Sequence, residues 1–103
     1  MPKLVRDLIP DLFPAYTYRV LEKGEYASAL RDKLTEEAQE YLTDRTAEEL
    51  ADVMEVLHAL AALHGLTPEG LEELRARKAS ERGGFAERFW LEDHVTYKEP
   101  NAR

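Results

Sequence analysis

The sequence predicts an all-α protein: a helical bundle built on an antiparallel helix hairpin, with a short extended segment near its C-terminus. Apolar residues recur at three- and four-residue spacing in two long central segments, threonine-based helix starts precede later segments, and glycines follow them. The 103 residues leave room for one domain, residues 1–103. Because so short a chain buries little of its surface alone, we expect a homodimer or a higher homo-oligomer.

Charge and composition exclude several classes of protein. With 14 Lys and Arg against 21 Asp and Glu, the net charge is −7, so no nucleic-acid partner is expected. The absence of cysteine excludes disulfides, thiolate metal sites and cysteine nucleophiles. Charged residues interrupt the N-terminal segment, and no apolar run approaches the roughly 20 residues of a membrane span. We therefore expect a soluble, cytoplasmic protein with no membrane contact.

The first half of the chain divides into an arm and a long helix. Three prolines make residues 1–17 a turn and an extended lead-in rather than part of the core. The first long helix is expected from Gly24 or Glu25 to about Thr43. Its apolar stripe consists of Leu30, Leu34, Ala38, Tyr41 and Leu42.

A second helix has a marked start and an unusually apolar surface. Thr46 and Glu49 have the spacing of a capping box, in which each side chain satisfies a backbone N–H of the other residue. The helix stops at Gly65, and from Ala51 to Leu63 it is apolar nearly all round. We expect it to be the most buried helix and the centre of the bundle.

The third helix is expected to open at Thr67 and Pro68 and to end at Gly83-Gly84. The segment from Phe85 to about Tyr97 has the aromatic and β-branched residues typical of an extended or hairpin segment. Its aromatic side chains could stack on a nucleobase, but core packing is the commoner use of such residues. These aromatic residues are Phe85, Phe89 and Trp90.

Acidic pairs lie at i, i+3 spacing on both sides of the predicted hairpin. Glu37 and Glu40 are on the first helix, and Glu49 and Asp52 are on the second. A short connection makes the helices antiparallel, so the four carboxylates can meet at one level. One such pair alone usually belongs to a solvated face, but two pairs in register with apolar stripes favour a metal site. Oxygen-only ligands favour Mg²⁺, with Mn²⁺ as the alternative.

These pairs also resemble the motifs of a known family. Glu37-Ala-Gln-Glu40 and Glu49-Leu-Ala-Asp52 are similar to the E-x-x-E and E-x-x-D elements of the MazG-like all-α NTP pyrophosphatases. The opening KLVRDLIP, residues 3–10, and the later K-x-x-x-R-G-G-F, residues 78–85, resemble the small branch described as house-cleaning enzymes for non-standard nucleotides. Only eight residues separate Glu40 from Glu49, fewer than is usual in the family, so the hairpin must be tight.

The resemblance implies hydrolysis of the α/β-phosphoanhydride of a nucleoside triphosphate, which gives a nucleoside monophosphate and pyrophosphate. It also implies that Mg²⁺ is held by Glu37, Glu40, Glu49 and Asp52. Glu36 and Glu37 would be the catalytic residues, with Glu36 either a further ligand or the base that orients water. Glu55, one turn beyond Asp52, could join the metal ligands or support them.

Five basic residues are candidates for substrate phosphates: Lys3, Arg6, Lys33, Lys78 and Arg82. For Lys33 an ion pair with Glu37 is favoured, and for the other four a surface role is equally compatible. His58 is expected to be a hydrogen-bonded core residue rather than a ligand. Two other functions stay open: a non-catalytic helical interaction module with an acidic metal-binding face, and hydrolysis of phosphoribosyl-ATP.

Overall fold

The computed structural model describes residues 2–93. In this part of the chain there are helices and no strand, which confirms the all-α class. The helices are α1 (Ile9–Leu12), α2 (Lys23–Asp44), α3 (Ala47–Leu63) and α4 (Pro68–Arg82). Residues 83–93 form neither helix nor strand, and the rest of the predicted extended segment, including Val95 and Tyr97, lies outside the described residues.

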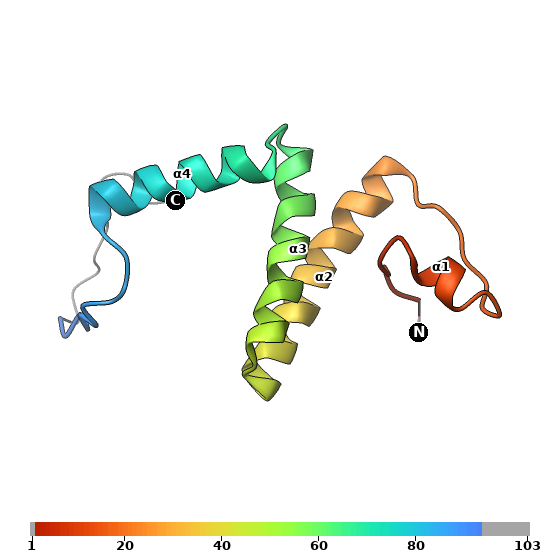
Figure 1. Ribbon diagram of the computed structural model, residues 1–103, viewed down its shortest axis with the longest axis horizontal. Coiled ribbons are helices and arrows are strands. Elements are labelled where there is room, and N and C mark those ends of the chain that lie inside the picture. The colour runs from red at the N-terminus through yellow and green to blue at the C-terminus, as the bar shows by residue number, and fades with distance from the viewer. Residues whose placement is uncertain (1, 94–103) are drawn as a thin grey trace.

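Helices α2 and α3 form the antiparallel hairpin that the sequence predicts (Figure 1). Only Arg45 and Thr46 connect them. Arg45 adopts a left-handed conformation with φ of 59°, and its N–H donates to the Tyr41 carbonyl at 2.7 Å, which ends α2. The Arg45 side chain also donates from Nε to the Leu42 carbonyl at 3.2 Å. The connection is therefore tight and hydrogen-bonded.

The start of α3 follows the prediction only in part. The Glu49 N–H donates to Thr46 Oγ1 at 3.4 Å, so Thr46 is the N-cap. The Glu49 carboxylate does not return the bond: it lies near the carboxylates of Glu37 and Asp52, and its Oε1 has no hydrogen-bond partner among residues 2–93. The predicted reciprocal capping box is therefore wrong. The inward position of Glu49, among other carboxylates, takes this side chain away from the cap.

The core is small and lies between α2 and α3. Leu30 of α2 and Val56 of α3 are buried in it, and Ala61 is buried near the end of α3. Another side of α3, turned about 100° from the side that faces α2 and here called the outer face, exposes Leu50 and Met54. The expectation that α3 is buried on several sides is thus wrong for one chain, because α2 covers one side and α4 packs only at the end of α3.

Helix α4 begins and ends where the sequence predicts, but it leaves the hairpin. The Gly70 N–H donates to Thr67 Oγ1 at 3.0 Å, and Pro68 occupies the first turn. Gly65, with φ of 77°, allows the chain to turn after α3. Figure 1 shows α4 projecting sideways from the top of α3, and the two axes differ by 100°.

The segment after α4 does not pack in a core. Its aromatic side chains are almost fully exposed, so the expectation of core packing is wrong for Phe85, Phe89 and Trp90. At the other end of the chain, the arm and the one-turn helix α1 lie beside α2 (Figure 1). Within residues 2–93 no individual helix has both the length and the apolar character to cross a membrane, although α3 and α4 as a bent pair meet that test by length and composition.

Candidate metal centre

Glu37 lies on the inner side of α2, as its spacing predicts. It follows Leu30 and Leu34 in the stripe that faces α3 and precedes Tyr41. Only 8% of Glu37 is exposed, while Leu34 and Tyr41 are half-buried. A carboxylate buried among apolar neighbours loses hydration, so it needs a hydrogen-bond or charge partner.

Two carboxylates of α3 face Glu37 across the hairpin. Glu49 and Asp52 are one turn apart and are both half-buried. One carboxylate oxygen from each of Glu37, Glu49 and Asp52 lies within 4.8 Å of the other two. Three of the four predicted ligands therefore come together from two helices.

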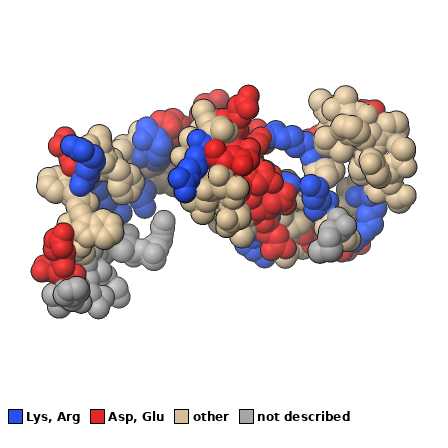
Figure 2. All heavy atoms as spheres, turned by 90° about the horizontal axis from the view of Figure 1, so that it is seen from below, with Lys and Arg blue, Asp and Glu red and all other residues tan. Residues whose placement is uncertain are grey.

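The fourth predicted ligand belongs to a second group. Glu36, Glu37 and Glu40 also have carboxylate oxygens within 4.8 Å of one another, and Glu40 is exposed. The expected single level of four carboxylates is replaced by two groups that share Glu37. We call these five residues the acidic cluster: Glu36, Glu37, Glu40, Glu49 and Asp52. Figure 2, seen from the hairpin end, shows acidic side chains concentrated there and basic ones to either side.

Glu49 is the carboxylate most affected by this crowding. Burial raises the pKa of Glu49, and the negative charges of Glu40, Asp44 and Asp52 raise it further. Among residues 2–93, Glu49 Oε1 is buried without a hydrogen-bond partner. A cation at this position would satisfy that atom and compensate the neighbouring negative charges.

A lysine of α2 neutralises part of the acidic cluster. Lys33 Nζ lies 3.1 Å from Glu36 Oε2 and 3.4 Å from Glu37 Oε2, which confirms the predicted ion pair and adds a second partner. Burial lowers the pKa of Lys33, but its hydrogen bonds and attraction to the two glutamates outweigh burial, so the pKa is raised. Lys33 is therefore held charged beside the cluster.

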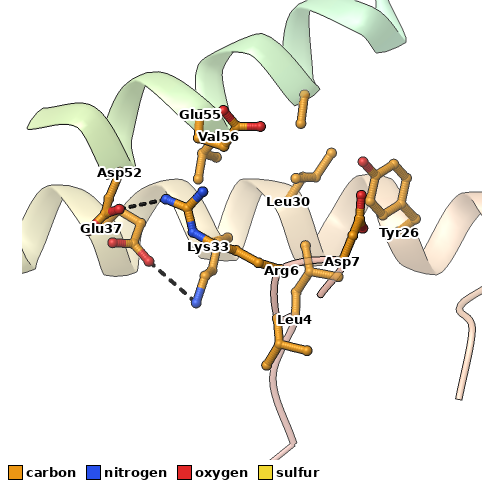
Figure 3. Close-up of a pocket in the computed structure, with 12 residues that line it drawn as sticks. Leu4, Arg6, Asp7, Tyr26, Leu30, Lys33, Glu37, Asp52, Glu55 and Val56 are labelled. Carbon is orange, nitrogen blue, oxygen red and sulfur yellow. Dashed lines mark hydrogen bonds and ion pairs between the residues drawn. The ribbon is translucent and has the colours of Figure 1, made fainter. Parts of the chain in front are cut away.

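The N-terminal arm brings a second cation. Arg6 Nη2 lies 2.5 Å from Asp52 Oδ1, and Figure 3 shows the guanidinium reaching from the arm to α3 beside Glu37. The arm thereby closes one side of a pocket of about 170 Å³. Its polar wall includes Arg6, Lys33, Glu37, Asp52 and Glu55, and its apolar wall includes Leu4, Tyr26, Leu30, Val56 and Ala59.

Sequence reasoning missed part of this pocket. Tyr26 lies one turn before Leu30 on the same face of α2, so extending the apolar stripe toward the N-terminus would have found it. Leu4, Val5 and Asp7 had no such signal, because their position depends on how the arm folds back. His58 is half-buried on α3, so it is not the core residue that was expected, and Glu55 is exposed at the pocket.

Three of the predicted phosphate-binding residues are not brought to the acidic cluster. Lys3 is exposed and does not line the pocket, although its neighbour Leu4 does. Lys78 and Arg82 lie on the outer half of α4, which points away from the hairpin (Figure 1). Lys78 is roughly 15 Å along the axis of α4 from its start, at 1.5 Å per residue. Of the five candidates, Arg6 and Lys33 form ion pairs with the acidic cluster in the described part of the chain.

The donor set fits a hard divalent cation. Carboxylate oxygens from Glu37, Glu49 and Asp52 are the ligands that Mg²⁺ and Mn²⁺ take, and Mg²⁺ retains water molecules and accepts phosphate oxygens in its remaining positions. Comparisons with models of protein families, with curated proteins and with solved structures found no match for this chain.

Proposed function

We propose that this chain is a Mg²⁺-dependent nucleoside triphosphate pyrophosphohydrolase that acts on non-standard nucleotides. It would cleave the α/β-phosphoanhydride and release a nucleoside monophosphate and pyrophosphate. One observation carries the proposal: Glu37, Glu49 and Asp52 direct carboxylate oxygens from two helices to within 4.8 Å of one another, with Glu37 buried. Lys33 pairs with Glu37 and Arg6 pairs with Asp52, and a metal ion would compensate the negative charge that these ion pairs leave.

In this proposal Glu37, Glu49 and Asp52 hold Mg²⁺, and Glu40 contributes from the edge of the acidic cluster. Mn²⁺ is the alternative metal, since it takes the same oxygen ligands. When bound, the metal supplies Lewis-acid chemistry: it neutralises phosphate charge and lowers the pKa of water. The buried Oε1 of Glu49 supports this assignment, because no described residue forms a hydrogen bond with it.

Glu36 is the proposed base. It is half-buried beside Glu37, and Lys33 holds its carboxylate at 3.1 Å. In the reaction a water oxygen bonds to phosphorus of the anhydride, the bridging P–O bond breaks, and Glu36 accepts the proton of the water. Water supplies the oxygen atom that replaces the bridging oxygen at phosphorus. The step therefore needs neither a separate phosphate nucleophile nor a covalent enzyme intermediate.

Arg6 and Lys33 are the proposed phosphate contacts nearest to the acidic cluster. Arg6 could exchange Asp52 for a phosphate oxygen, because a guanidinium pairs with both kinds of anion. The pocket beside it, about 170 Å³, is smaller than the roughly 300 to 1,000 Å³ of ordinary small-molecule sites. It therefore accommodates only part of a nucleotide. Lys3, Lys78 and Arg82 would act only if other parts of the substrate or of an assembly reached them.

The test is release of pyrophosphate from a panel of standard and non-standard ribo- and deoxyribonucleoside triphosphates, with phosphoribosyl-ATP included. We expect release with Mg²⁺ or Mn²⁺ and none with EDTA, and inorganic phosphate should not appear as a primary product. Release of orthophosphate alone would indicate cleavage at the γ-phosphate and would contradict the proposed bond specificity. Turnover of phosphoribosyl-ATP alone would identify the third function considered above.

A second candidate is a non-catalytic interaction module that binds metal through its acidic face. The exposed apolar side of α3 favours it, because an uncovered apolar helix face is typical of a protein that associates with another chain. The same panel separates the two functions. Metal binding by calorimetry without turnover of any nucleotide would support the interaction module.

A further inference from the structure

Two basic residues neutralise the acidic cluster, and they are held there in different ways. Lys33 shares a helix with its partners, Glu36 and Glu37, and its side chain is only 15% exposed. Arg6 comes from the N-terminal arm, 46 residues away from its partner Asp52, and its side chain is 57% exposed. Helical spacing keeps Lys33 beside its glutamates, whereas an exposed ion pair stabilises little. Arg6 is therefore the cation that can leave the cluster.

The arm has few other attachments to the hairpin. In the described part of the chain, the Arg6–Asp52 pair is the one hydrogen bond between residues 2–12 and either α2 or α3. No Cα atom of α1 lies within 8 Å of one in another helix. Leu4 and Val5 are half-buried at the pocket. This single ion pair and the apolar contacts at the pocket therefore hold the arm in place.

Asp52 belongs to two arrangements at once. It is one of the three carboxylates that converge from α2 and α3, and its Oδ1 atom also accepts the hydrogen bond from Arg6. Figure 3 shows the guanidinium beside Glu37 as well as Asp52. A divalent ion among these carboxylates would lie next to the guanidinium, and the two cations would repel each other. The ion also attracts each carboxylate with twice the charge of Arg6, so it is the stronger competitor for Asp52.

We propose that Arg6 supplies a missing positive charge in the metal-free chain, and that Mg²⁺ displaces it from Asp52 and releases the arm. Because the arm closes one side of the pocket, its release opens the pocket beside the acidic cluster. The freed guanidinium is then available to phosphate oxygens, which explains how one arginine serves both states. This inference rests on the metal centre of the proposed function and adds a metal-controlled gate to it.

The coupling between Arg6 and Mg²⁺ is reciprocal. If the metal weakens the contact of the arm with Asp52, then that contact must weaken metal binding by the same factor. The factor is limited to about 5-fold, because an exposed ion pair supplies no more. Two independent measurements, one on the arm and one on the metal, should therefore give matching changes.

Hydrogen exchange reports the release of the arm. The Ile9 N–H donates to the Arg6 carbonyl at 3.1 Å, and its exchange with solvent is measured by NMR. Saturating Mg²⁺ should make it exchange about 2- to 5-fold faster in the unaltered chain. In Arg6→Ala the faster exchange should already be present in EDTA, and Mg²⁺ should add nothing. The Gly70 N–H, which donates to Thr67 Oγ1 in α4, is the control and should not respond.

Calorimetry with Mg²⁺ alone measures the reciprocal effect. Arg6→Ala should bind Mg²⁺ about 2- to 5-fold more tightly than the unaltered chain, because the competing cation is gone. Lys3→Ala is the charge-matched control: it removes one positive charge from the same arm, but Lys3 is exposed and does not line the pocket. Its affinity should stay close to that of the unaltered chain. Equal tightening in both variants would mean long-range charge rather than competition for Asp52, and would overturn the proposal.

These measurements need no nucleotide, so they separate the gate from the reaction. Mg²⁺ binding that leaves Ile9 exchange unaltered would show that Asp52 holds both cations together; the gate would then be overturned while the metal centre remained. A chain that binds no Mg²⁺ would overturn the gate and the metal centre alike. Tighter binding by Arg6→Ala, together with metal-dependent exchange at Ile9, would establish the gate even if no nucleotide were hydrolysed.

Discussion

Two sides of α3 depart from the usual distribution of polar and apolar residues. The side that packs against α2 carries Glu49 and Asp52 next to the buried Glu37. The outer face, which carries no charge, exposes Leu50 and Met54. Single exposed leucines are common in proteins, but a buried carboxylate is unusual unless it is paired, and a row of exposed apolar residues has a reason.

The difference shows that stability alone does not explain how α3 is used. If the hairpin were optimised only as a folded monomer, Glu49 and Asp52 would face water, and Leu50 and Met54 would be covered. Instead, the inner side concentrates negative charge, which a metal ion can compensate, and the outer face offers apolar area, which a second chain can cover. The two sides therefore make separate predictions.

Substitution of the inner carboxylates should have the largest effect. Glu37→Gln, Glu49→Gln and Asp52→Asn should each lower pyrophosphate release by about 100-fold or more, because each change removes a metal ligand while preserving side-chain shape. Glu40→Gln should act in the same direction. Steady-state turnover at saturating Mg²⁺ is the measurement, with circular dichroism to verify the helical fold.

Glu48→Gln is the control for these substitutions. Glu48 precedes Glu49 in the sequence but is exposed and turned about 100° from it around α3. Its amide variant should keep nearly unaltered turnover. Equal damage from Glu48→Gln and Glu49→Gln would remove the distinction between the sides of α3, as would wild-type turnover in all the inner variants.

Divalent metal should have the next largest effect, on stability. At a free Mg²⁺ concentration 100 times its Kd, binding to the folded state alone adds about 2.7 kcal/mol to the free energy of unfolding. We expect thermal unfolding to shift upward by several degrees with Mg²⁺ or Mn²⁺, and the shift should be lost in Glu37→Gln. Met54→Glu should keep the metal response if its hairpin stays folded. A melting temperature that ignores both metals would contradict the metal centre.

A smaller effect is expected from pH in the absence of metal. Because burial and neighbouring carboxylates raise the pKa of Glu49 above its ordinary value of 4.5, the folded state holds this proton more tightly than the unfolded state. The contribution of Glu49 to stability is therefore fully present below pH 4.5 and is lost as the pH rises through the raised pKa.

Glu49→Gln isolates this contribution from other titrating groups. The free energy of unfolding of the variant, relative to the unaltered chain, should increase as the pH rises from 4.5. Urea unfolding at several pH values in EDTA measures it. A relative stability that stays constant with pH would mean that Glu49 is not crowded by the other carboxylates.

The smallest effect concerns the arm that borders the inner side. Arg6 and Asp52 are 57% and 40% exposed, so Arg6→Ala should cost less than about 1 kcal/mol of global stability. Locally, the Ile9 N–H, which donates to the Arg6 carbonyl at 3.1 Å, should exchange faster, because the ion pair that holds Arg6 to α3 is lost. Arg75→Ala, which removes a similarly exposed pair with Glu72, should leave exchange in the arm unaltered. Unchanged protection in Arg6→Ala would show that other contacts hold the arm.

The sequence was sufficient for the elements that short-range patterns specify. Spacing placed Glu37 inside the hairpin, and capping residues placed the starts of α3 and α4 at Thr46 and Thr67. The Lys33–Glu37 pair followed from helical spacing alone. Such features depend on neighbours within one or two turns, which periodicity describes directly.

Longer-range features were not predictable in the same way. Periodicity shows that α3 is apolar all round but not how many partners one chain supplies, so its exposed outer face was missed. The side chain of Glu49 had two competing positions, at the cap or toward Glu37, and spacing along the sequence does not distinguish them. The path of the arm over Tyr26 and the departure of α4 by 100° depend on loops without a distinguishing pattern.

The two-residue connection between α2 and α3 also restricts which sequence changes this chain can accept during evolution. Arg45 and Thr46 complete the turn with no spare residue, since one ends α2 and the other caps α3. Inserting or deleting one residue there would rotate α3 by about 100° relative to α2 and exchange which side chains meet. Leu50 and Met54 could then turn toward α2 while Asp52 turned outward. The length of this turn should therefore tolerate point substitutions far better than insertions or deletions.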